Sequence, residues 1–290
     1  MNIYKKGRDG YPKRLEPLPG MPEELYVEGK LPDDERPAIA IVGARNCSHY
    51  GANMAKEYAR FLGKAGVQII SGLARGIDTW AHEGALLVDA HTFGVLGCGV
   101  DICYPASNRK LFEKMKEQGG VLSEFPPGSP PLAYHFPQRN RVISGLSDAV
   151  LIIEAKEKSG SLITADYALE QGKTVFALPG RVGDLLSEGC NRLIYQGAIP
   201  AWCPEMILEE MNWNTKSSKK SENEKENEIL GLAREDNLVY SCLNLNPKSI
   251  ANLQDETGLP CQEIMKSLVQ LQIRGLAKEI WKNNYIRREE

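Results

Sequence analysis

Four short blocks of glycine, hydroxyl, amide and arginine residues have the chemistry to bind phosphate groups. In the first, residues 41–51 (IVGARNCSHYG), an apolar run enters a glycine-bounded loop and then a helical pattern. Backbone N–H groups at such a helix start can receive a phosphate, and an arginine can add a bidentate hydrogen bond. An ordinary strand-to-helix turn explains this block alone equally well. The candidate phosphate contacts here are Gly43, Arg45, Ser48 and Gly51.

Two further blocks repeat the pattern of a strand, a loop of small residues and a helix start. Residues 71–82 (SGLARGIDTWAH) contain two glycines that permit close backbone approach, and Asp78 is more simply explained as a helix cap than as a catalyst. In residues 154–166 (EAKEKSGSLITAD), Ser161 and Thr164 can donate hydrogen bonds to phosphate oxygens. Capping of the helix alone is the simpler role for one of them.

The last block, residues 136–143 (FPQRNRVI), places two arginines and two amides at a predicted helix start. Its candidate phosphate contacts are Arg139, Asn140 and Arg141. The surrounding charge pattern supports this role, because no Asp or Glu occurs from residue 125 to residue 147.

Positive charge also accumulates in other loops. Between residues 36 and 77 the only acid is Glu57, among six Lys and Arg residues, and Arg109 and Lys110 follow the third predicted strand. Loops that follow parallel strands converge on one edge of the sheet. The chain has a net charge of -3, so we expect a local basic cleft, with aromatic rings beside it as in single-strand binders.

The composition argues against several other classes. No apolar run is long enough to cross a bilayer and no signal peptide is evident, so a cytoplasmic protein is expected. The seven cysteines form no C-x-x-C pair and have no histidine at zinc spacing, which favours free thiols and no metal site. The P-loop, H-E-x-x-H and G-x-S-x-G motifs are absent, and no nucleophile has an evident base. We therefore predict a binding protein without a cofactor, not an enzyme.

The fold class predicted is α/β, an extended Rossmann-like, doubly wound and mostly parallel sheet with a small C-terminal winged-helix domain. Five short apolar runs alternate with helical patterns, as strands buried on both faces do: residues 38–42, 67–70, 92–96, 149–153 and 174–178. The predicted organisation is a proline-rich lead-in with a short strand (1–36), the Rossmann-like domain (37–211), a polar linker (212–228) and the winged helix (229–290).

The C-terminal segment shows the pattern of three helices and a β-wing. Helices are predicted at residues 229–243, 247–258 and 260–274, and a two-stranded wing at 276–286 turns at Asn283–Asn284. Residues 228–290 contain eight Lys or Arg and nine Asp or Glu, and the third helix offers only two basic residues. This is weak for a module that reads a DNA groove, so a winged-helix regulator is a secondary alternative.

Taken together, these blocks resemble the DNA-processing protein family, DprA (also called Smf). The resemblance covers most of the chain in order and includes residues 10–15, 41–51, 71–82, 96–105, 123–126, 136–146, 159–165, 179–180 and 189–194. It implies an extended Rossmann fold and binding of single-stranded DNA. It also implies loading of the recombinase RecA onto DNA taken up in natural transformation. By matching position, Arg45, Arg109 or Lys110, and Arg139 would contact phosphates.

Two departures from the family pattern stand out. Ala44 replaces the serine that usually precedes the first arginine, and the helical domain common before residues 11–12 is missing or reduced. An alternative class is an enzyme, because residues 159–166 are similar to the phosphate loop of nucleotide phosphoribohydrolases. Ile163, however, occupies a glycine position of that loop, where its side chain would obstruct the phosphate.

The segment 191–200 is a candidate dimer interface. Leu193 and Ile194 point about 100° apart on a helix, so burial of both needs cover on two sides, and Ile199 follows them. A second subunit or a returning helix at residues 204–211 would supply that cover, and the family resemblance favours a homodimer.

Overall fold

The chain forms two compact units in the computed structural model, residues 1–215 and 216–290. The structure describes residues 1–213, 234–244, 247–281 and 283–287. Most of the predicted linker, 212–228, lies outside these ranges. In the part of the chain that is described, no helix has the length and apolar character needed to cross a membrane.

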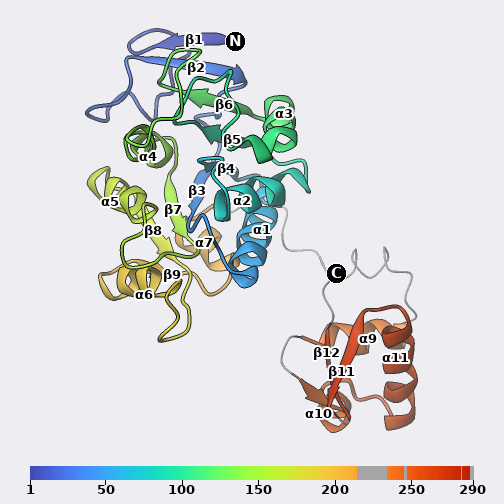
Figure 1. The fold of residues 1–290 in the computed structure, drawn as a ribbon. Helices are drawn as coiled ribbons and strands as arrows, with labels where there is room; N and C mark the ends of the chain where they lie inside the picture. Colours follow the sequence, from blue (N-terminus) through green and yellow to red (C-terminus); the bar gives the residue numbers. More distant parts are fainter. Residues whose placement is uncertain (214–233, 245–246, 282, 288–290) are drawn as a thin grey trace. The chain divides into compact units, whose positions relative to one another are not determined.

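One nine-stranded sheet organises the first unit, in the order β1-β2-β6-β5-β4-β3-β7-β8-β9 (Figure 1). Every neighbouring pair from β6 to β9 in this order is parallel. The two remaining pairs are antiparallel: β2 with β6, and β1 with β2. The predicted α/β fold with a mostly parallel sheet is confirmed. The strands are β1 (Asn2–Lys5), β2 (Glu24–Gly29), β3 (Ala38–Val42), β4 (Gln68–Ser71), β5 (Thr92–Val95), β6 (Gly120–Ser123), β7 (Ala149–Ile152), β8 (Thr174–Ala177) and β9 (Ile199–Pro200).

Helices cover both faces of this sheet (Figure 1). On β3, Ile39 and Ile41 belong to one apolar core and Ala38, Ala40 and Val42 to the other, so the strand is buried on both sides. One face carries α1 (His49–Lys64), α2 (Ile77–Leu86), α3 (Arg109–Gln118, after the 3-10 turn Ala106–Asn108) and α7 (Glu205–Glu210); the other carries α4 (His135–Gly145), α5 (Leu162–Glu170) and α6 (Glu188–Tyr195).

Residues 1–36 belong to the α/β unit and are not a separate lead-in. β2 pairs with β6 and β1 pairs with β2, so this segment adds two strands to the sheet. Between them, Tyr11 and Leu15 are buried in the same core as α4. The many prolines conceal this role from a pattern analysis, because the connection has no regular period.

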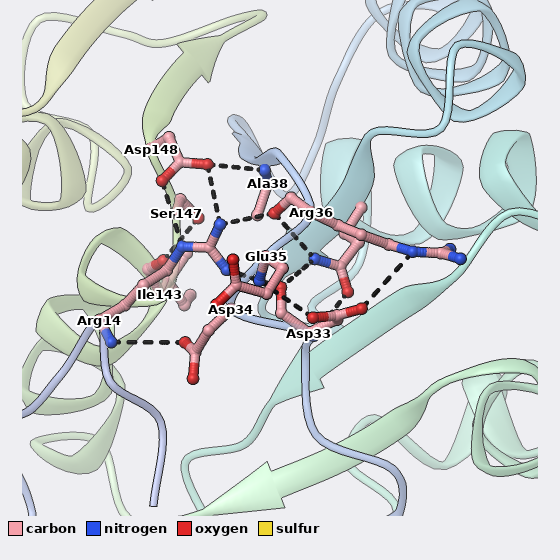
Figure 2. Close-up of polar contacts among 10 residues, drawn as sticks. Arg14, Asp33, Asp34, Glu35, Arg36, Ala38, Ile143, Ser147 and Asp148 are labelled. Atoms are coloured by element: carbon pink, nitrogen blue, oxygen red, sulfur yellow. Dashed lines mark hydrogen bonds and ion pairs between the residues drawn. The ribbon is translucent and has the colours of Figure 1, made fainter. Parts of the chain in front are cut away.

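Arg14 ties this segment to the amino ends of β3 and β7 (Figure 2). Its guanidinium donates two hydrogen bonds of 3.1 Å to the carboxylate of Asp148, which also accepts the backbone N–H of Ala38 at 2.9 Å. The same guanidinium donates to the carbonyl oxygens of Asp33 and Arg36. A half-buried bidentate pair with two further carbonyl contacts fixes the segment on the sheet.

The second unit is a small α/β module with its own core. It contains α9 (Arg234–Cys242), α10 (Ile250–Thr257), α11 (Cys261–Ile273) and a sheet of order β10-β12-β11, with β10 (Lys248–Ser249), β11 (Ala277–Trp281) and β12 (Asn284–Arg287). Ser249 and Asn252 form a capping box at the start of α10, and Gly258 ends that helix in the left-handed conformation. The third predicted helix and the two strands of the wing are confirmed. The second predicted helix begins at Ile250 and not at residue 247, because Lys248–Ser249 form β10, a third strand that was not predicted. The first predicted helix is described from Arg234, and residues 229–233 lie outside the described ranges.

Candidate nucleic-acid interface

A cleft opens where the strand order reverses, between β3 and β7. The chain passes from β3 to α1 on one face and from β7 to α5 on the other, so the two loops diverge at the carboxyl ends of the strands. The resulting cavity has a volume of about 620 Å³. It is lined by the loop after β3 (43–46), the start of α4 and the loop before α5 (156–161).

Arg45 is the exposed arginine of the cleft. Its guanidinium carbon lies 5.2 Å from the ring centroid of Phe136, a distance at which the cation and the ring attract each other. Tyr104 packs against the same ring at 5.5 Å between centroids and is 45% exposed. Arg45 takes part in none of the ion pairs among the described residues. The cleft therefore holds an available guanidinium beside aromatic rings.

The opposite wall adds two lysines that the sequence analysis did not select. Lys156 and Lys158 are exposed and line the cavity, together with Ser161 and Thr164. Ser159 and Ser161 share a hydrogen bond of 2.8 Å between their hydroxyls. The sequence pattern of this loop pointed only to the hydroxyls of Ser161 and Thr164, and the structure adds the two lysines to the cavity wall.

Asn140 connects α4 to the same loop. Its amide donates to the carbonyl of Gly160 at 3.2 Å, and the residue lines the cavity while it is largely buried. The predicted candidates that line this one cavity are Gly43, Arg45, Arg139, Asn140, Ser161 and Thr164.

The start of α1 is closed by a carboxylate from the segment that follows β7. Glu154, which is 3% exposed, accepts the backbone N–H of Ser48 at 2.8 Å and its hydroxyl at 2.5 Å. The Ser48 hydroxyl in turn caps the helix by accepting the N–H of Gly51 at 3.0 Å. The predicted phosphate contacts Ser48 and Gly51 are therefore engaged inside the protein.

Steric contacts explain the two glycines of this block. A Cβ on Gly51 would lie 2.3 Å from Cδ of Glu154, and a Cβ on Gly43 would lie 2.7 Å from Ile77. Both distances are shorter than any van der Waals contact allows, so these positions need glycine for packing.

Arg139 lines the cavity but is almost completely buried. The residue is 4% exposed, and Nη1 donates to the carbonyl of Gly72, at 2.6 Å, and to that of Val95. It thereby connects α4 to the ends of β4 and β5. Burial lowers the pKa of Arg139 to about 10, so the side chain is still charged at neutral pH. This placement favours a structural role over the phosphate contact predicted from the sequence.

Asp78 shares this buried region. Its carboxylate accepts the backbone N–H groups of Gly72 and Ala74 at 3.1 and 3.3 Å, so it braces the loop after β4. Burial raises the pKa of Asp78, and the positive charge of Arg139 opposes that shift. The helix cap predicted for Asp78 is replaced by a loop contact, because Gly76 occupies the cap position of α2.

Three other predicted cations lie away from the cavity. Arg141 pairs with Glu124 at 2.6 Å, and both side chains are mostly buried. Glu124 is the acid that bounds the acid-free segment, so a residue distant in sequence neutralises this arginine. Arg109 and Lys110 are exposed at the start of α3, where Arg109 lies 3.7 Å from Glu113, and neither lines the cavity.

The candidate dimer residues differ in burial. Leu193 is 7% exposed and belongs to the core between the sheet and α4–α6. Ile194 packs against that core in part, and Ile199 packs against the core that contains Ile207 of α7. Ile199 is thus partly buried within one chain. Tyr195, in contrast, is 91% exposed.

The chain is a Rossmann-like protein with a doubly wound sheet. Its switch-point cleft carries exposed cations and aromatic rings, an arrangement typical of proteins that bind phosphate groups. Within the described ranges, no cluster of three or more His, Cys, Asp or Glu residues suited to a metal was found. A model of the family DNA recombination-mediator protein A matches residues 2–212, and the chain belongs to this family. The resemblance noted in the sequence is confirmed.

Three similar proteins illustrate the relationship. The chain is 41% identical to Protein Smf of Escherichia coli K12 over 270 residues, which span 91% of this chain and 72% of that protein. The X-ray structure of DNA processing protein A (DprA) from Streptococcus pneumoniae superposes with a TM-score of 0.67 and 40% identity, covering 72% and 74% of the two chains. The structure of DNA processing protein A from Helicobacter pylori, described for its single-stranded DNA binding mode, superposes with a TM-score of 0.65 and 31% identity. The match covers 73% of this chain and 96% of that chain.

Proposed function

We propose that this chain binds single-stranded DNA in the cytoplasm, protects incoming strands and loads RecA onto them during natural transformation. Family membership and the H. pylori relative described for single-stranded DNA binding support this function. The observation that carries it is Arg45, an exposed guanidinium held on the Phe136 ring in a cleft with two further cations. Such a cleft binds phosphates, and the adjoining rings offer stacking surfaces for bases.

The chain performs this role by binding and without catalysis. Both buried carboxylates next to the cleft, Asp78 and Glu154, already accept backbone N–H groups. Ile163 lines the cavity at the position where the phosphoribohydrolase loop has glycine. A side chain there obstructs the approach of backbone to a phosphate, which disfavours the hydrolase alternative.

The test is a titration of the full chain with a labelled oligonucleotide at several salt concentrations. We expect Arg45→Ala to weaken binding by about 1–2 kcal/mol, roughly tenfold in Kd. The slope of log K against log salt should fall by about 0.7, the value for one lost phosphate contact on a single strand. Arg8→Ala, an exposed arginine on the β1–β2 connection, is the control. Wild-type affinity and slope in folded Arg45→Ala would overturn the assignment.

A homodimer formed through the β9 edge of the sheet is part of the proposal. Exposed apolar side chains surround that edge, with Tyr195 at 91% and Trp202 at 68% exposed. A two-fold contact would join two clefts, so that one strand could engage both with a raised effective concentration.

Two glutamate substitutions should separate dimerisation from folding. Tyr195→Glu is expected to give a monomer in light scattering at micromolar concentration with an unchanged melting temperature, because the side chain contacts solvent within one chain. Leu193→Glu should lower the melting temperature sharply, because it places a charge in the core. A wild-type chain that is monomeric at these concentrations would contradict the dimer.

A further inference from the structure

Arg75 is an exposed arginine in the loop after β4. Its neighbour Ala74 lines the cavity of the cleft, whereas Arg75 itself does not. A Cβ on Gly76 would lie 2.5 Å from the carbonyl oxygen of Arg45, so the loops that carry the two arginines are packed backbone against backbone. Within the described ranges Arg75 takes part in no ion pair. A second available guanidinium therefore lies at the edge of the cleft.

The loop that carries Arg75 is also fastened to the start of α3. Asn108, the last residue of the 3-10 turn before α3, is buried. Its amide donates to the carbonyl of Leu73 at 3.1 Å and to the hydroxyl of Thr79 at 2.9 Å. Thr79 in turn donates to the carbonyl of Ala74 at 2.7 Å. Arg75 thus lies on a loop held between the cleft and the start of α3.

The start of α3 continues the positive charge. Arg109 and Lys110 are both exposed there, and in the described part of the chain Lys110 has no ion pair. Arg109 lies 3.7 Å from Glu113, and a pair this long between exposed side chains is weak. No Asp or Glu occurs from residue 58 to 77 or from 102 to 112, so the segments that form this surface add no negative charge.

A second cavity, of about 450 Å³, offers another way out of the cleft. It lies between the loop before α5 and helix α6, and residues 158–160 line both cavities. Its arginine, Arg192, is paired with Glu157 at 2.9 Å, and Asp166 is exposed on its wall. A phosphate in this second cavity would compete with the ion pair and would approach a carboxylate. The charges therefore favour the path past Arg75.

We propose that a strand bound in the cleft leaves it over Arg75 and runs to the start of α3, where Lys110 contacts a further phosphate. This inference rests on the proposed function, and it gives the cations an order along the strand. Arg45 binds inside the cavity, Arg75 at its edge and Lys110 beyond it. Only strands long enough to leave the cavity reach the last two, so the contribution of each cation depends on strand length.

A length series of labelled oligothymidylates, from about 4 to about 16 nucleotides, titrated with the full chain tests this path. Arg75→Ala should bind the shortest strand that wild type binds with unchanged affinity, and the longest strand about fivefold more weakly. The slope of log K against log salt should fall by about 0.7 for the longest strand only. Arg75→Lys should keep most of the affinity, because an ammonium group also pairs with phosphate. Arg45→Ala should weaken binding at every length.

Arg192→Ala is the matched control, an exposed arginine on the second cavity, and should bind every strand as wild type does. If Arg192→Ala weakens the binding of long strands and Arg75→Ala does not, the strand leaves through the second cavity and the proposal is wrong. An equal loss in Arg75→Ala at all lengths would also overturn it, because Arg75 would then act inside the cleft. A wild-type chain that binds no strand contradicts the proposed function itself. Binding that needs Arg45 but not Arg75 contradicts only the path.

Discussion

Replacement of Arg139 by alanine is expected to lower the free energy of unfolding of the α/β unit by about 3 kcal/mol. The guanidinium is 4% exposed and donates to the carbonyls of Gly72 and Val95, which would lose their partner. Asp78, buried nearby, would also lose the positive charge that opposes the rise of its pKa. A cavity left by the side chain adds to the loss.

Urea unfolding of the full chain, followed through the transition of the α/β unit, measures this change. Arg75→Ala, an exposed arginine in the loop after β4, is the control and should remain within about 0.5 kcal/mol of wild type. The opposite result is equally clear. Suppose that Arg139→Ala keeps its stability, but that the slope of log K against log salt for oligonucleotide binding falls by about 0.7. Arg139 then contacts a phosphate directly, as the sequence pattern suggested.

The strands that the sequence predicts are those with a strong apolar signal. Five runs correspond to β3, β4, β5, β7 and β8, because a strand buried on both faces must be apolar throughout. β6 was missed, since four residues that begin with Gly120 carry no period. β1 and β9 were missed because they are short edge strands, which are stabilised by pairing with a neighbour and carry little apolar signal of their own.

The position of the site was predictable, but the direction of each side chain was not. Topology places every loop after a parallel strand at one edge, so Arg45 and Ser161 were correctly brought to the same region. Which arginine faces the cleft depends on partners far away in sequence. Glu124 engages Arg141, and two strand ends accept from Arg139. A count of charges within a window cannot contain such contacts.

Glu154 illustrates the same limit most clearly. Glu154 is 106 residues from Ser48 in the sequence, so no local pattern reveals their contact. Ser48 and Gly51, in the block 41–51, match a phosphate loop by residue type alone. In the structure the carboxylate takes the place at the α1 start that a bound phosphate would occupy. The phosphate-binding groups that we propose for the cleft are consequently the side chains of Arg45, Lys156 and Lys158, rather than the helix start.

A double-mutant cycle between Gly51 and Glu154 tests this interpretation. Gly51→Ala alone should destabilise the α/β unit by about 2 kcal/mol, since its Cβ would lie 2.3 Å from the Glu154 carboxyl carbon and overpack a tight site. Glu154→Ala alone should cost about 3 kcal/mol, because Ser48 loses a charged hydrogen-bond partner.

In the Glu154→Ala background the effect of Gly51→Ala should reverse its sign. The clash is then gone, and alanine inside α1 is favoured over glycine by about 0.5–1 kcal/mol. The two substitutions should therefore show a coupling energy of about 2–3 kcal/mol in urea unfolding. Gly63→Ala, another glycine of α1, clashes with Ala90 and not with Glu154, so its effect should be the same in both backgrounds. If Gly51 instead served to admit a phosphate, Gly51→Ala would leave stability unchanged or raised in the wild-type background and would weaken only oligonucleotide binding.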